Sequence, residues 1–356
     1  MPPNHRNRYI ERLTHMAATI KQVAALADVS TATVSYVLNG TGTVTEATRQ
    51  RVMDVVARLN YQPSHAARSM RGRSYTLGLT LPALPGRLAD PALAELLSGL
   101  SDAAALRGYY LLLATAGAES EAELCMNLSR TGRVDGLLLL DMQVDDERAR
   151  ALCEADIPHA CAGPVPAGCN SPFVLVDGRV AAATALQHLL GLGHQRIGLI
   201  QLPSELAESE PRYLGYADAL ATARLEIDPA LIVEAGRGEE DGYQAMGELL
   251  GAPQPPTAVL ACSDELAFGA MHAIYDAGLE VGRDVSLVGF DDVPLAARTH
   301  PPLTALRQPR RAVGEHLAAL LADAIEHRAH AAKSATLSAR LVVRRSTGPP
   351  RISYPL

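Results

Sequence analysis

Residues 19–39, TIKQVAALADVSTATVSYVLN, predict two short helices joined by a tight turn. Apolar side chains recur at helical spacing from Ile20 to Ala27. Thr19 can cap this first helix, with Gln22 three residues later as its capping-box partner. Ser30 can cap a second helix that carries its apolar residues on one face. The stretch therefore predicts a helical head with a steep change of direction in its middle.

The outward face of the second predicted helix is small and polar. Its side chains are Thr31, Ala32, Thr33, Ser35 and Tyr36. A slim helix of this kind, following another at a steep angle, predicts a helix-turn-helix that lays its second helix in the major groove of DNA. The alternative is an ordinary helical hairpin packed on a core, because this turn is not reserved for DNA binding.

Charge is distributed unevenly along the chain. The 356 residues have a formal net charge of -7. Residues 1–73 hold ten Lys and Arg against four Asp and Glu, a net +6, so the remainder carries −13. A basic head on an acidic body favours phosphate contacts at one end only. The alternative is that the Arg-rich head is basic only because this makes it soluble. The large difference in net charge between head and body makes that the weaker explanation.

The composition indicates a protein of the reducing cytoplasm. Five scattered cysteines without a CxxC pair indicate neither a disulfide framework nor a zinc site. Residues 1–18 lack an apolar run of signal-peptide length, and no later stretch has the uninterrupted apolar length of a membrane span. We therefore expect no membrane partner. The residues before Thr19 are expected to form a disordered basic arm or to result from an over-long gene start.

The sequence changes character after the head. Residues 45–59 predict a third helix, and Pro63 ends any continuation of it. Residues 64–71 could form only two helical turns, which are marginal without a partner surface. This segment is therefore either a linker that folds on contact or a merely flexible one.

From Ser74 onward, strands alternate with amphipathic helices. This alternation predicts parallel sheets with helices on both faces, and its length allows two lobes. Such sheets bind ligands in the crevice outside the carboxyl ends of their strands. The predicted strands are 76–81, 109–114, 136–140, 173–176, 197–201, 258–261 and 285–289, and the predicted helices are 92–107, 121–131, 181–192 and 266–277.

Several motifs follow the head along the chain, and their order is informative. After the head come NYQPSHAARSM at 60–70, RVDGLLLL at 133–140, PTAVLACSDELAFGAMHAI at 256–274 and DVSLVGFDDVPLA at 284–296. In this order they resemble the lactose-repressor (LacI/GalR) family of bacterial transcription regulators, from about Thr19 to about Pro350. The resemblance implies a small all-α helix-turn-helix head on an α/β body like a periplasmic binding protein, with two doubly wound parallel-sheet lobes.

The resemblance also implies domain boundaries. The expected parts are the arm at 1–18, the DNA-binding head at 19–63, a hinge helix at 64–73, the effector-binding and dimerisation body at 74–350, and a tail at 351–356. Within the body, the first lobe is expected at about 74–162 and 309–338. The second is expected at about 163–305 and 339–350.

The DNA-contacting positions of the family match residues of the second head helix. The resemblance implies that base edges are read by Thr31, Ala32 and Tyr36. It implies that phosphate contact or helix positioning falls to Thr33, Ser35 and Asn39. Hydroxyl and methyl groups of these types suit thymine methyls and base edges.

The hinge matches the family with one departure. Ala66 and Ala67 are small enough to let two hinge helices approach each other. Met70 stands where the family usually has Leu, at the position where a pair of side chains wedges into the minor groove. Methionine is apolar and adaptable, so it can still enter a base step.

Five body residues are candidate effector ligands. Asp264 follows a predicted strand, at an N-cap position that capping alone could explain, and it matches the family's ligand-binding aspartate. Arg212 matches the arginine that contacts effector hydroxyls or carboxylates. Asp141, at the end of a predicted strand, and Gln308, at an apparent crossing between lobes, are weaker candidates.

Arg237 is the fifth candidate and the second departure. It stands where several family members place an aromatic plate, and the chain has no Trp and only three Phe. Arg212 and Arg237 are therefore predicted to clamp a carboxylate or phosphate together. The alternative is an exposed loop residue beside Glu239 and Glu240. The expected effector is a small polar metabolite, sugar-like by resemblance, with an anionic compound as a serious candidate.

Enzyme motifs are missing from the sequence. There is no Walker loop, no HExxH, no GxSxG and no complete dinucleotide loop, so we expect no catalytic residues, metal or cofactor. The predicted function is a ligand-responsive repressor that binds a near-palindromic operator as a homodimer. A tetramer is not expected, because the C-terminus lacks heptad leucines. The alternative is a cytoplasmic solute-binding sensor without specific operator binding.

Overall fold

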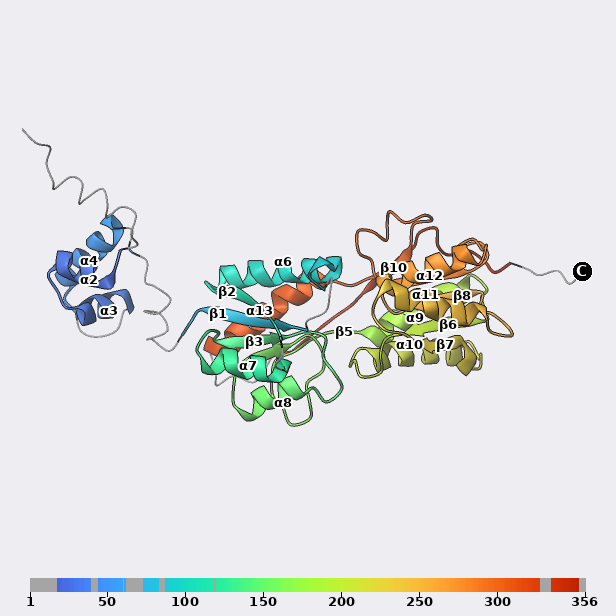
Figure 1. Ribbon diagram of the computed structural model, residues 1–356, viewed down its shortest axis with the longest axis horizontal. Coiled ribbons are helices and arrows are strands. Elements are labelled where there is room, and N and C mark those ends of the chain that lie inside the picture. The colour runs from blue at the N-terminus through green and yellow to red at the C-terminus, as the bar shows by residue number, and fades with distance from the viewer. Residues whose placement is uncertain are drawn as a thin grey trace, which may run out of the picture. The chain divides into compact units, whose positions relative to one another are not determined.

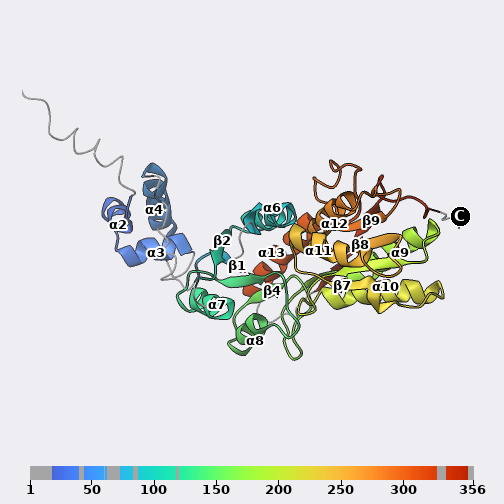
Figure 2. The same ribbon diagram turned by 45° about the vertical axis from the view of Figure 1, so that its right-hand side comes forward.

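The computed structural model describes residues 18–39, 44–59, 61, 73–82, 87–117, 120–326 and 334–351. These residues fall into two compact units, divided between Ser74 and Tyr75. The described part of the first unit is helical, and the second alternates strands and helices (Figures 1 and 2). The predicted arm before Ala18 and the hinge residues lie outside the described residues. Those hinge residues are Ala66, Ala67 and Met70.

The first unit is a small bundle of α2 (Ile20–Ala27), α3 (Thr31–Asn39) and α4 (Glu46–Arg58). Its core contains Val23, Val34 and Val52, none of which is exposed. So small a unit depends on this apolar contact because each helix is too short to persist alone.

The predicted helix caps of the head are confirmed. Thr19 and Gln22 form the reciprocal capping box at the start of α2. The Ser30 hydroxyl accepts a hydrogen bond from the Thr33 amide at 3.0 Å. Thr45 likewise caps α4. These bonds satisfy amides that the first helical turn leaves without partners, so the sequence positions the two helices of the motif locally.

The first lobe of the body is a parallel sheet covered on both faces. In the described residues its strand order is β2-β1-β3-β4, with all three pairings parallel. Helices α6 and α13 pack on one face, and α7 and α8 on the other (Figure 1). The bounds are β1 (Thr76–Leu81), β2 (Tyr110–Thr115), β3 (Gly136–Leu139), β4 (His159–Cys161), α6 (Pro91–Leu106), α7 (Glu121–Arg130), α8 (Glu147–Glu154), α13 (Arg310–Glu326) and the 3-10 helix η1 (Arg87–Ala89).

The second lobe repeats this design. Its strand order is β12-β10-β9-β8-β6-β7, and β12 alone among these described strands runs antiparallel. Helices α9 and α10 pack together, as do α11 and α12. The bounds are β6 (Ile197–Gln201), β7 (Ile232–Glu234), β8 (Ala258–Ala261), β9 (Ser286–Asp291), β10 (Thr304–Arg307), β12 (Arg340–Val342), α9 (Gly178–Gly191), α10 (Ser209–Thr222), α11 (Glu239–Leu250), α12 (Asp264–Asp276) and the 3-10 helix η2 (Pro229–Leu231).

The boundary between the lobes differs from the expected one. Strand β5 (Val174–Val176) pairs in parallel with β11 (Ala335–Leu337). Val174 is buried in the core beneath α6 and α13. The first lobe therefore extends to residue 176 rather than ending near 162, because the chain completes this pairing before it crosses to α9.

No helix among the described residues is both long enough and apolar enough to span a bilayer.

Two glycines allow α6 and α13 to pack closely. A Cβ atom at Gly314 would lie 2.3 Å from the carbonyl oxygen of Leu96, and one at Gly99 would lie 2.1 Å from that of Arg311. Backbone atoms cannot turn aside as a flexible side chain does. Close packing of this pair closes one face of the first lobe.

We expect Gly314→Ala to lower the free energy of unfolding of the full chain by about 1–3 kcal/mol, because the helices must separate. Gly247→Ala is the matched control, since no atom lies within 4 Å of its Cβ position in α11. Removing a helical glycine there should stabilise the chain by about 0.5–1 kcal/mol. Urea denaturation followed by circular dichroism measures both. Unchanged stability of Gly314→Ala would show that the helices separate without cost.

Candidate functional site

Helix α3 separates its apolar and polar side chains as predicted. Val34 and Val37 are buried in the head core. Thr31 and Ala32 are exposed, and the Tyr36 ring is 50% exposed. Such exposure leaves a large aromatic side chain available to a partner surface.

Thr33, Ser35 and Asn39, the other contacts predicted in the head, lie on the same helix. Thr33 and Ser35 are half-buried, and the hydroxyls of Thr33 and Ser30 lie 2.9 Å apart in a hydrogen bond. Asn39 is the last residue of α3, and its side chain lies outside the described part of the structure. The capped first turn therefore holds Thr31 and Ala32 rigidly at the beginning of the helix.

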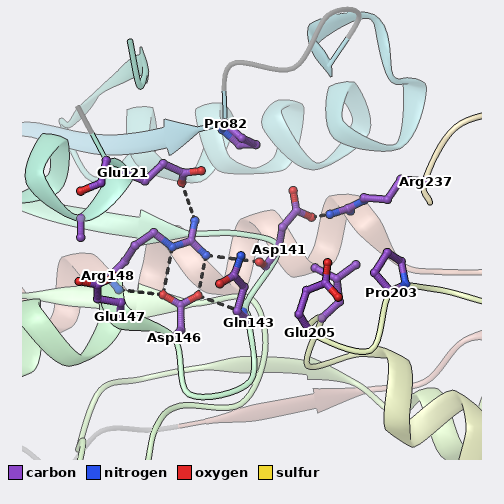
Figure 3. A pocket seen from close by; sticks show the side chains of 13 residues that line it. Pro82, Glu121, Asp141, Gln143, Asp146, Glu147, Arg148, Pro203, Glu205 and Arg237 are labelled. Carbon is purple, nitrogen blue, oxygen red and sulfur yellow. Dashed lines mark hydrogen bonds and ion pairs between the residues drawn. The ribbon is translucent and has the colours of Figure 1, made fainter. Parts of the chain in front are cut away.

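A cavity of about 350 Å³, lined mostly by charged and polar residues, lies where the two lobes of the body meet (Figure 3). The first lobe contributes residues from the ends of its strands and the beginnings of α7 and α8. The second lobe contributes loops that follow β6 and β7. The cavity is lined by Pro82, Ser120, Glu121, Ala122, Asp141, Gln143, Asp146, Glu147, Arg148, Pro203, Glu205, Leu206 and Arg237.

Asp141 and Arg237, both predicted ligands, form an ion pair across this cavity. The Arg237 Nη2 atom donates to the Asp141 Oδ1 atom at 3.0 Å (Figure 3). Asp141 follows β3 with a φ of 49°, and Arg237 directly precedes the start of α11. The burial of Arg237 alone would lower its pKa, but the charge of Asp141 leads the opposing effects and the pKa is raised. The pair therefore stays charged while it joins the lobes.

Backbone hydrogen bonds join the lobes beside this ion pair. The Val144 amide donates to the Glu205 carbonyl at 2.8 Å, and the Ala207 amide donates to the Met142 carbonyl at 2.9 Å. These bonds form a short antiparallel bridge between two loops. Sequence reasoning missed this bridge, because backbone pairing of irregular loops leaves no signal in residue type.

Arg148 holds the first-lobe wall of the cavity. Its Nη2 atom donates to the Leu140 carbonyl at 2.9 Å and to Asp146 at 2.7 Å, and its Nη1 atom donates to Glu121 at 2.7 Å. Burial alone would raise the pKa of Asp146, but the hydrogen bond and charge of Arg148 prevail and lower it. Sequence reasoning also missed Arg148. The acidic cap followed two residues later by an arginine was its only signal.

Asp264 is buried at the start of α12. The N-cap prediction was wrong by one residue, because Ser263 is the cap and its hydroxyl accepts from the Leu266 amide. Asp264 Oδ2 accepts from the Val293 amide at 2.8 Å, whereas Oδ1 is buried without a hydrogen-bond partner among the described residues. Burial, followed by the charge of Asp291, raises the pKa of Asp264 well above its ordinary value. Such an acceptor is suited to a ligand hydroxyl.

Gln308 contacts Asp291, whose carboxylate also lies beside Asp264. The Gln308 amide donates to Asp291 Oδ1 at 2.8 Å, and Arg310 donates to that oxygen at 2.5 Å. Asp291 ends β9, and Arg310 begins α13, which belongs to the first lobe. The segment in which the chain returns to the first lobe is thus held to the carboxyl end of β9 by an ion pair and a hydrogen bond.

Arg212 and Arg237, the two residues of the predicted clamp, each contact a carboxylate. Arg212 is only 3% exposed and donates to the Cys262 carbonyl and to Glu208. Its guanidinium also lies 4.1 Å from the centre of the Phe290 ring. Since each arginine already faces a carboxylate, neither presents an uncompensated charge to an anion. Only Asp141 and Arg237 among the five candidates line the cavity.

The described residues hold no cluster of His, Cys, Asp or Glu that could bind a metal ion.

Known proteins resemble both units. Residues 19–64 match the family model of bacterial regulatory proteins, lacI family, and residues 186–347 match a periplasmic binding protein-like domain. The HTH-type transcriptional regulator AglR of Rhizobium meliloti (strain 1021) is 36% identical, over 96% of this chain and 97% of its own.

Two solved structures extend this similarity to the fold. A complex of the transcriptional regulator CelR with cellobiose has a TM-score of 0.72 at 33% identity, and the match covers 92% of this chain and 99% of that one. The lac repressor dimer bound to operator and the anti-inducer ONPF has a TM-score of 0.78 at 28% identity, and the match covers 94% of this chain and 100% of that one.

We expect Asp264→Asn to stabilise the free protein by about 1–2 kcal/mol at pH 8, and to have little effect near pH 4. The raised pKa means that the folded state binds the proton more tightly than the unfolded state. The contribution of Asp264 to stability is therefore present below the ordinary aspartate pKa and is lost as the pH rises through the raised value, and the amide removes this loss.

Urea denaturation at pH 4, 6 and 8 measures this difference. Glu265→Gln, at the exposed neighbouring position in α12, is the control and should change stability little at any of these pH values. A pH-independent difference between wild type and Asp264→Asn would contradict the expectation.

Proposed function

Since this chain belongs to the LacI family of bacterial regulatory proteins, we propose that it is a ligand-responsive repressor that binds a near-palindromic operator as a homodimer. The chain is a transcriptional regulator and not an enzyme. The observation that carries the proposal is that one chain contains both an exposed helix in the head and a cavity in the body. A capped helix exposes small polar residues and one tyrosine, and the body has a cavity, lined mostly by charged and polar residues, between two lobes.

In this proposal α3 lies in the major groove of each operator half-site. Thr31, Ala32 and Tyr36 read base edges there, because their side chains are exposed on the helix face opposite the core. Thr33, Ser35 and Asn39 contact phosphate or hold the helix in place. Ala66, Ala67 and Met70 form the hinge that contacts the minor groove. Two identical heads on a dimer require a near-palindromic site.

The second copy is proposed to cover the edge of the first lobe. Strand β2 is the end strand of the described sheet, and its Tyr110 is 57% exposed. Leu113 on the same strand is 37% exposed, and Leu106 at the end of α6 is 88% exposed. Apolar side chains along a sheet edge favour a covering surface, and the related lac repressor structure is a dimer.

The proposed effector is a small neutral compound rich in hydroxyl groups. Carboxylates accept from hydroxyls and guanidinium groups donate to them, and the region offers both types in compensated pairs. Such a compound would enter beside Asp141 and Arg237 and extend toward Arg212, Asp264 and Gln308. The CelR structure contains cellobiose, a compound of this chemical class.

The interlobe contacts supply a mechanism for control. An effector that replaces the Asp141–Arg237 pair with its own hydrogen bonds changes how the lobes are held together. If the spacing of the lobes sets the spacing of the two heads, effector and operator each alter the affinity of the other by the same factor.

We expect Tyr36→Ala to weaken binding to the selected operator by at least about tenfold, because one base-reading contact contributes about 1–3 kcal/mol. Fluorescence anisotropy with operator and with scrambled DNA measures the loss and its specificity. Met53→Ala is the control, since Met53 is an exposed apolar residue on α4. Equal loss on both DNAs would show that Tyr36 does not read sequence.

Release of the wild-type protein from its operator tests the whole proposal. The operator is selected from random fragments and then titrated with neutral sugars, sugar acids and sugar phosphates. We expect a neutral sugar to release the protein, and Asp141→Asn to raise the required concentration about tenfold because an ionised acceptor is lost. Release by anions alone would overturn the effector class. Failure to select any palindrome would favour a solute sensor.

A further inference from the structure

Two cysteines lie together at the edge of the first lobe, away from the cavity. Cys153 is in the last turn of α8, and Cys169 is in the connection between β4 and β5. The Cys169 thiol donates to the Ala149 carbonyl oxygen at 4.0 Å. In an α-helix the amide of residue 153 donates to this same oxygen. Cys153 is also among the groups that raise the pKa of the Cys169 thiol.

This pair differs from the other cysteines of the chain. Cys125, Cys161 and Cys262 are fully buried, whereas Cys153 and Cys169 are only half-buried. A small reagent can therefore reach the pair and not the others.

The connection that carries Cys169 contains a tight turn with a glycine in the left-handed region. The Cys169 amide donates to the Pro166 carbonyl at 3.1 Å, which closes a tight turn. Gly168 within this turn has a φ of 87°, and no atom lies within 4 Å of the position of an added Cβ.

We propose that Cys153 and Cys169 form a redox modification site that hydrogen peroxide oxidises to an intramolecular disulfide. In the first step a thiolate attacks one peroxide oxygen, the O–O bond breaks, and the sulfur becomes a sulfenic acid as hydroxide leaves. In the second step the other sulfur attacks the sulfenic sulfur. The S–O bond breaks, the S–S bond forms, and the departing hydroxyl leaves as water with the second thiol's proton. Two thiols and one peroxide thus give one disulfide and two waters.

The surroundings of Cys169 disfavour its ionised form. Burial, followed by the hydrogen bond with Cys153, raises the pKa of the Cys169 thiol to about 11. The thiolate is the reactive form, and this rise disfavours it at Cys169.

The disulfide would tie down a helix that borders the effector cavity. Asp146 caps the other end of α8, and Arg148 in its first turn donates to the Leu140 carbonyl at the cavity wall. Oxidation would join the last turn of this helix to the connection before β5. The inference concerns the chemistry of this lobe and does not depend on which effector the cavity binds.

Peptide mapping of the full-length protein tests the proposal. The reduced protein is treated with hydrogen peroxide, alkylated, and digested with trypsin and a glutamate-specific protease. Cys153 is then in peptide 151–154, and Cys161 and Cys169 are both in peptide 155–179. We expect a cross-linked product of these peptides, lighter by two hydrogens than their sum and lost on reduction. Fragmentation should place the link at Cys169.

Two controls make the outcome decisive. Cys125 and Cys262 serve as internal controls, and each should be recovered in the reduced form. In Cys169→Ser the cross-link should disappear, and Cys153 should be trapped by dimedone as a sulfenic acid. The proposal is overturned if wild-type Cys153 and Cys169 are recovered without a link, if each is oxidised singly, or if the link uses Cys161.

Discussion

The ion pair of Asp141 and Arg237 joins two lobes whose sheets share no strand. A charge held in a partly buried cavity must be compensated, and here the compensation comes from the opposite lobe. The same rule governs the surrounding groups. Arg148 is held between Asp146 and Glu121, and Arg310 contacts Asp291. The charged side chains that line the cavity are five carboxylates and two arginines, so the lining does not favour an anion.

The pairing of charged side chains across the lobes also bears on how a ligand would act on them. Asp264 Oδ1, Arg212 Nε and Arg310 Nε are buried without a hydrogen-bond partner among the described residues, and the pKa of Asp264 is raised. A group that is poorly satisfied in the free protein gains most from a ligand that donates to it. The interlobe contacts oppose this gain because a ligand must replace them.

Much of the fold could be predicted because the signals are local. The predicted strands at 76–81, 197–201 and 258–261 coincide with β1, β6 and β8. These strands are continuous apolar runs, as strands buried on both faces must be. The strands that were missed, such as β4, β7 and β11, are each three residues long, so they carry too little periodicity to be recognised. The return of α13 to the first lobe came only from family resemblance.

The sequence by itself determined where the head helices begin, which of their faces are buried, and that a DNA-reading head precedes a two-lobed body. Helix caps and hydrophobic spacing depend on residues a few positions apart, so they can be recognised directly in the sequence. Only the tertiary structure decided which distant groups meet. Asp141 faces Arg237 across 96 positions of sequence, and Cys169 lies against α8 rather than deep in the core. Strand order and the crossings of the chain between the lobes determine these contacts. The type of a residue does not indicate which distant residue it contacts.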